Sequence, residues 1–144
     1  MTKADIVNIA DAIVTSLNGA TFSQSFTAVR SYNAEAELTD LDTLHVTVIA
    51  LKDDGQAETR GSSTHDYTIN IGIQKKPATI SNANVDPLVY LTQEIADHFL
   101  FDRFDVGIAT ASTVAVLFVE EHLRSMGQFT AVITLTMNGE RDHV

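Results

Sequence analysis

The stretch that decides the fold is THDYTINIGIQKK, residues Thr64–Lys76. Its large side chains Tyr67, Ile69, Ile71 and Ile73 alternate with polar residues. Successive side chains of a strand point to opposite faces, so these four share one face. The spacing predicts a half-buried strand with one face on a core and the other toward water or a neighbouring subunit.

A second run, LHVTVIAL at Leu44–Leu51, is rich in β-branched residues and predicts a strand that pairs with the first as an antiparallel hairpin. The connection between them, Lys52–Ser63 (KDDGQAETRGSS), is longer than the usual hairpin loop of about two to five residues. Its glycines and serines favour flexibility. We therefore predict a long hairpin loop, which is either a disordered tip or an arm that orders against another subunit.

Two segments have helical spacing. Asp5–Leu17 places its apolar residues on one face, with a capping-box spacing from Thr2 to Asp5 and a left-handed end predicted at Asn18-Gly19. Asp86-Pro87 predicts an N-cap and first helical position for a second helix that ends near Leu100.

The remaining segments are assigned from their alternation and polarity. Phe22–Tyr32 and Phe129–Met137 alternate and predict a first and a last strand, and Val114–Val119 predicts a short apolar strand. The other segments are an acidic connector at Asn33–Thr43, an ambiguous stretch at Phe101–Thr113, a connector with room for a helical turn at Glu120–Gly127, and a frayed polar tail at Asn138–Val144.

The order of elements predicts the fold class. Helix, three strands, helix and two strands follow one another without an internal repeat or a domain boundary, in a chain of 144 residues. At this size folding buries about 68 to 70% of the surface of the unfolded chain. We predict one α+β domain over residues 1–144, with a mostly antiparallel sheet of about four to five strands and two helices packed on one face.

Composition excludes several classes of function. The net charge is -10, from 19 acidic and 9 basic side chains, and Lys75-Lys76 is the one basic cluster. Conventional nucleic-acid binding needs clustered cations and is disfavoured, whereas an acidic surface suits a protein past which DNA slides. The absence of cysteine excludes disulfides and thiolate metal sites. No apolar run approaches the roughly 20 residues of a membrane span, and the N-terminal segment is unlike a signal peptide, so we expect a soluble intracellular protein.

The sequence offers few candidates for chemistry. The five histidines lack zinc spacing, and we expect structural or surface roles for them, with one exception. His45, His65 and Asp66 would converge if the hairpin closed in the expected register. Ser62-Ser63 with His65 and Asp66 contains the residue types of a nucleophilic triad, but no nucleophile elbow is present and neighbours on a strand point apart.

Carboxylates and phosphate-binding motifs give no further site. The pairs Asp53-Asp54 and Glu120-Glu121 lack the additional oxygen ligands of a calcium loop, so we expect solvated charge at both. No glycine-rich phosphate loop is present. We predict no catalytic residue, no metal site and no cofactor, and the sequence is more typical of an assembly component than of an enzyme.

Most of the chain resembles small bacteriophage and prophage proteins of the neck or tail end of long-tailed virions. The segments that carry the resemblance are ADIVNIADAIVTSL, SQSFTAVRSY, LHVTVIAL, HDYTINIGIQKK, DPLVYLTQEIADHF and GQFTAVITLTM. In order of elements and in length the chain is most similar to tail terminator proteins. The resemblance implies a small α+β subunit that forms a ring, generally of six copies, which caps the tail tube and docks to the connector of the head.

The resemblance also implies partners and an interface. The partners would be further copies of the chain, the tail tube protein and the head–tail connector or a head completion protein, with DNA passing through the lumen without specific binding. The location would be the virion, reached from the host cytoplasm. The segment Lys52–Ser63 matches the position of an interface arm, so the implied interface residues are Lys52, Asp53, Asp54, Glu58 and Arg60.

Two alternatives stay open from sequence. One is another neck component, such as a head completion protein, an adaptor or a tail tube subunit. The other is a small intracellular ligand-binding or enzymatic α+β module, which would have a deep pocket near His45, His65 and Asp66 and would be a monomer or dimer.

Overall fold

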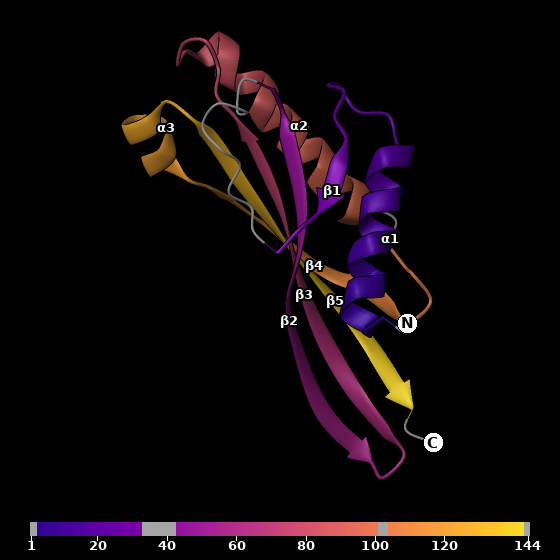
Figure 1. The fold of residues 1–144 in the computed structure, drawn as a ribbon. Coiled ribbons are helices and arrows are strands. Elements are labelled where there is room, and N and C mark those ends of the chain that lie inside the picture. The colour runs from indigo at the N-terminus through magenta and orange to yellow at the C-terminus, as the bar shows by residue number, and fades with distance from the viewer. Residues whose placement is uncertain (1–2, 33–42, 101–103, 143–144) are drawn as a thin grey trace.

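A computed structural model describes residues 3–32, 43–100 and 104–142. The elements in chain order are α1 (Asp5–Gly19), β1 (Ala28–Arg30), β2 (His45–Thr59), β3 (Ser62–Lys75), α2 (Asn82–Leu100), β4 (Ala109–Phe118), α3 (Glu120–Met126) and β5 (Phe129–Asp142). The five strands form one sheet in the order β1-β2-β3-β5-β4 (Figure 1). The short β1 runs parallel to β2, and the other neighbours are antiparallel. The predicted α+β class is confirmed.

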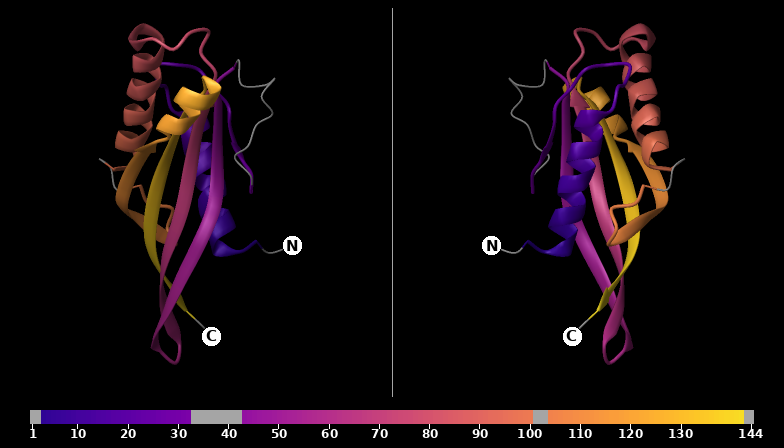
Figure 2. Two further views of the ribbon diagram at one scale, coloured as in Figure 1. Left: turned by 90° about the vertical axis from the view of Figure 1, so that its left-hand side faces the viewer. Right: turned by 90° about the vertical axis from the view of Figure 1, so that its right-hand side faces the viewer.

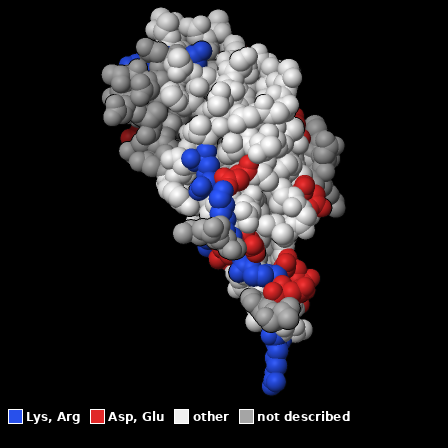
Figure 3. Space-filling view, turned by 45° about the vertical axis from the view of Figure 1, so that its right-hand side comes forward, with Lys and Arg blue, Asp and Glu red and all other residues white. Residues whose placement is uncertain are grey.

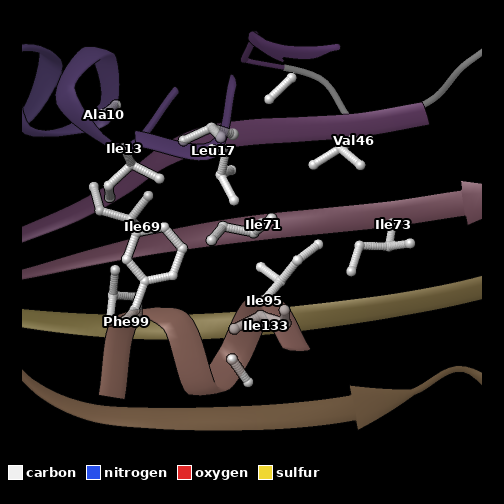
Figure 4. Packing of buried hydrophobic residues seen from close by; sticks show 14 of the residues in the cluster. Ala10, Ile13, Leu17, Val46, Ile69, Ile71, Ile73, Ile95, Phe99 and Ile133 are labelled. Atoms are coloured by element: carbon white, nitrogen blue, oxygen red, sulfur yellow. The ribbon is translucent and has the colours of Figure 1, made fainter. Parts of the chain in front are cut away.

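The core lies between the sheet and the helices α1 and α2, which cover the same face of the sheet (Figure 1). Ile69, Ile71 and Ile73 of β3 are fully buried there, as predicted from their alternation. Figure 4 shows Ile13 of α1 and Ile95 of α2 among the side chains packed beside them. Each such side chain contributes about 1.5 to 3 kcal/mol by leaving water, so this one apolar face supplies most of the driving force.

The predicted strand at Phe22–Tyr32 is wrong except for the three residues of β1. Phe22 and Phe26 instead stack on each other, with ring centroids 5.5 Å apart, and pack partly buried against the core. The side chain of Asn18 explains where the strand begins. It accepts a hydrogen bond from the Ala28 amide at 2.7 Å and donates one to the Ala28 carbonyl at 3.1 Å.

The helix ends also differ from their predictions. Ala4 is the N-cap of α1 and makes no side-chain cap, and the C-cap Ala20 is extended, so the predicted left-handed end does not form. The predicted capping box depends on Thr2. Thr2 lies outside the described residues. Helix α2 begins four residues before Asp86 because Ser81 caps it, accepting the Asn84 amide on its hydroxyl at 3.3 Å, and Pro87 therefore lies inside the helix.

The C-terminal half is more regular than predicted. β4 begins at Ala109, and Glu120–Met126 is a helix that ends at Gly127, whose φ of 62° is left-handed. β5 continues through most of the predicted polar tail, to Asp142. The connector predicted at Asn33–Thr43 and part of the ambiguous stretch at Phe101–Thr113 lie outside the described residues.

Candidate functional site

The predicted hairpin loop is wrong, because Lys52–Ser63 is almost entirely strand. β2 and β3 continue past the body and meet at a two-residue turn, Arg60-Gly61, and the end of β5 runs beside them, with Asp142 opposite Ser62. We call residues 52–66 of the hairpin together with residues 138–142 of β5 the arm. Figures 1 and 2 show it projecting from the end of the sheet. β2 pairs with β3 here, and β3 also pairs with β5, so ladder hydrogen bonds form along the arm despite the poor strand preference of glycine and aspartate.

One face of the arm continues the buried face of the sheet with polar side chains. His65 lies there with 8% of its surface exposed. Its Nδ1 lies 2.6 Å from Asp53 Oδ1 and its Nε2 lies 2.7 Å from Ser63 Oγ. The ring stacks on Tyr67 at a centroid distance of 5.6 Å. Three side chains from β2 and β3 thus form one hydrogen-bonded row at the base of the arm.

Arg141 joins this row to helix α1. It donates hydrogen bonds to Asp5 at 2.9 Å, to Asp53 at 3.2 Å and to the Tyr67 hydroxyl at 3.1 Å. These bonds, that to Tyr67 first, raise the pKa of Arg141, and burial raises the pKa of Tyr67. The arm is therefore fastened to the first turn of α1 by a permanently charged guanidinium.

Gly55 makes room for this arrangement. It lies opposite His65 in the β2–β3 ladder, and a Cβ at this position would lie 2.7 Å from His65 Cε1. The glycine that suggested a flexible loop therefore has a packing role, because the imidazole ring lies against its backbone.

The Ser63–His65 and His65–Asp53 distances are those of a Ser–His–Asp catalytic triad. The sequence had suggested Asp66 as the acid of such a triad, but the structure has Asp53 there. Hydrolysis would also require free backbone N–H groups near Ser63 to bind an oxyanion. Ser63 lies in a central strand, opposite Ala57 on one side and Arg141 on the other, so the surrounding backbone is committed to the ladders. The row orients and fixes the arm, and we assign it no catalytic role.

The expected convergence of His45, His65 and Asp66 is wrong. His45 lies opposite Gln74, at the far end of the hairpin from His65, which lies opposite Gly55. Asp66 points to the other face, where it accepts a hydrogen bond from Asn138. Alternation along the strand separates Asp66 from His65, and the register separates His45 from both.

The five predicted interface residues all lie on the arm and divide among its surfaces. Lys52 and Asp54 form an exposed ion pair at 3.0 Å on the outer face, and Asp53 belongs to the inner row. Glu58 and Arg60 are exposed near the turn, and their side chains make no ion pair with any residue that the structure describes. Four of the five are therefore available to a partner, whereas Asp53 is used within the subunit.

The outer face of the arm concentrates negative charge. Asp54 lies directly opposite Asp66, a destabilising placement of like charges, and both line a shallow hollow of about 270 Å³. Figure 3 shows charged side chains gathered along the arm and its base, below a broad surface with few charges. A surface that tolerates such repulsion is suited to contact with a partner.

Sequence analysis missed Arg141 and the pairing of Asp53 with His65. The signal was the continued alternation of Ser63, His65 and Tyr67 toward the turn, and of Met137, Gly139 and Arg141 beyond the apolar part of β5. A bulge between Ala50 and Lys52 shifts the period of β2 and places Asp53 on the inner face.

Across residues 3–32, 43–100 and 104–142, no three acidic, histidine or cysteine side chains are grouped as a metal site, and no helix is long and apolar enough to span a membrane. No family model matches the sequence, and no curated protein matches it.

Proposed function

We propose that the chain is a structural protein of a bacteriophage virion, the tail terminator, which forms a ring that caps the tail tube and joins the tail to the head connector. The observation that carries the proposal is the arm. It is a three-stranded projection whose hairpin residues from Leu51 to Gly61 are all exposed. A buried His65 and a triply bonded Arg141 hold the inner face of this projection to the body, which leaves its exposed face for a partner.

The proposed mechanism is steric. A closed ring requires heterologous contacts, in which two different surfaces of each subunit meet. The arm provides one such surface, held in a fixed direction relative to α1. One face of the ring adds to the last tube subunits and stops growth, and the other offers a new surface to the connector. The acidic balance of the chain is compatible with a lumen through which DNA passes without adhering.

The small-module alternative loses the site on which it depended. It required a deep pocket at His45, His65 and Asp66, and these residues lie apart in the described sheet. A different neck component, such as an adaptor or a tube subunit, would use a similar arm. The test must therefore measure tail capping directly.

The test shortens the arm without disturbing its base. Deleting Lys52–Ser63 would also remove Asp53 and Ser63, so a smaller change is needed. Replacing residues 58–62 by Asn-Gly leaves Ala57 opposite Ser63 and supplies a turn that favours a two-residue hairpin.

We expect the shortened protein to fold with an unchanged circular dichroism spectrum but to fail to cap purified tail tubes or to restore joining of heads to tails in an extract lacking the native protein. The control is Gln93→Glu on the exposed side of α2. Light scattering and negative-stain images of the wild type should show rings, alone or on tube ends. Normal head–tail joining by the shortened protein would refute the role given to the arm, and absence of any binding to tubes by the wild type would refute tail capping.

A further inference from the structure

Two neighbouring lysines carry positive charge that no described carboxylate neutralises. Within the described residues, ion pairs occupy five cations: Lys3, Arg30, Lys52, Arg124 and Arg141. Lys75 and Lys76 have no carboxylate within 4.0 Å in that part of the chain. In a protein of net charge -10, two adjacent lysines without an ion pair among the described residues form a local patch of positive charge.

The lysines lie at the opposite end of the molecule from the tip of the arm. Lys75 is the last residue of β3, and the turn of the arm precedes the first. At about 3.3 Å per residue, the length of β3 separates the two ends by roughly 45 Å. We use the name cationic end for Lys75 and Lys76 alone, which lie at the end of the sheet away from the acidic arm.

The cationic end is also hollowed. Lys75 and Lys76 border a depression of about 430 Å³ together with Pro77, Ala78 and Asn84. A neighbouring depression of about 300 Å³ is lined by Lys75 and by Tyr90, whose side chain is 57% exposed. Ammonium groups beside an exposed aromatic ring in a concave surface suit a narrow, acidic protein segment.

We propose that this cationic end binds the acidic arm of a second copy of the chain. The arm carries six carboxylates against three cations. Four of those carboxylates, on Glu58, Asp66, Glu140 and Asp142, make no ion pair within the described residues. As a narrow projection, the arm can enter a depression that the broad body of a neighbour cannot.

The same charges decide the geometry of association. Contact between two cationic ends, or between two arms, places like charges together and is repulsive. A contact between the lysine pair and the arm brings opposite charges together, and such a contact is heterologous, which is the kind that closes rings. This inference rests on the proposed ring assembly and deepens it by naming the two surfaces that meet.

The test uses a charge exchange in the full chain. We expect Lys75→Glu with Lys76→Glu to weaken self-association at least about tenfold, because two attractive contacts become repulsive. Glu58→Lys with Glu140→Lys should weaken it similarly from the other side. Neither pair touches the row at the base of the arm. A mixture of the two variants should associate with an affinity within about threefold of the wild type, since each supplies the charges that the other lacks.

Sedimentation velocity at about 50 and 500 mM NaCl measures these affinities, and wild-type association should weaken at the higher salt, where charges more than about 4 Å apart are screened. Asn8→Glu with Thr15→Glu, two exposed positions on α1, controls for a general change in net charge. Circular dichroism checks that each variant is folded.

Three results would overturn the inference. The first is wild-type association by the lysine variant, the second is failure of the mixed variants to associate, and the third is a wild type that stays monomeric at low salt. Lysine-dependent retention of a DNA oligonucleotide without self-association would assign the cationic end to phosphate instead. In each case binding of the wild type to tail tubes still tests the proposed function separately.

Discussion

Arg141→Gln should destabilise the protein by about 2 kcal/mol. The guanidinium makes three hydrogen bonds, to Asp5, Asp53 and Tyr67, of which two are ion pairs. A fully buried charged bond contributes about 1.5 to 3 kcal/mol and an exposed ion pair about 0.2 to 1 kcal/mol. The side chains of Arg141 and Asp5 are each 34% exposed, so we expect each contact to contribute an energy close to that of an exposed ion pair. Glutamine retains part of the length but loses the charge and the fork of donors.

The assay is urea unfolding followed by circular dichroism, with hydrogen exchange of the arm amides as a local readout. Arg124→Gln is the matched control, because its one ion pair, to Glu120, spans 3.9 Å and its side chain is 72% exposed. We expect the control to change stability by less than about 0.5 kcal/mol. A double-mutant cycle with Asp5→Asn should show a coupling of about 1 kcal/mol.

Local exchange distinguishes a fastened arm from a merely stable protein. Loss of Arg141 should speed exchange in residues 62–66 more than in the core of β3, because the guanidinium joins the arm to α1. Equal stability of the Arg141 and Arg124 variants, or no change in arm exchange, would refute the fastening role.

Three further outcomes follow from the packing. Gly55→Ala should cost about 1 to 2 kcal/mol by displacing His65, whereas Gly19→Ala, whose added Cβ meets no atom within 4 Å, should be nearly neutral in the same urea titration. Ile71→Ala, at 0% exposure, should cost about 2 to 5 kcal/mol in thermal or urea unfolding. Burial raises the pKa of Tyr67, so the stability that the neutral phenol contributes is fully present below a pH of about 10 and is lost as the pH rises through the pKa of Tyr67 in the folded protein. Tyr67→Phe should therefore reduce the fall in melting temperature at alkaline pH, measured by melting curves over a series of pH values.

The alternation of Ile69, Ile71 and Ile73 was enough to predict a strand on a core, because apolar residues at a period of two leave few other ways to bury them. The same rule failed at Asp53 and Gly55, where polar or absent side chains leave no hydrophobic signal. Those residues are in strand because β2 pairs there with β3, and single-sequence patterns do not contain the identity of a partner. The sequence therefore predicted the body well and the arm poorly.

The candidate site was also predicted only in part. The segment that holds the interface residues was found from its length and charge, but its shape was not. Arg141 was missed because its three partners come from α1, β2 and β3, at positions that only the folded chain brings together. The length of the first strand was overestimated, because Phe22 and Phe26 have the even spacing of strand residues but pack as a stacked pair outside the strand.

The position of β5 has a consequence for how the subunit is made. β5 is the last strand to be synthesised, yet it lies between β3 and β4 and pairs with both. Until it leaves the ribosome, β3 lacks one neighbour, and β4 has no strand beside it in the described sheet. Long-range pairing of this kind is slow and leaves apolar edges open to wrong partners meanwhile. The sheet of the body and the third strand of the arm are therefore completed only after β5 has been made.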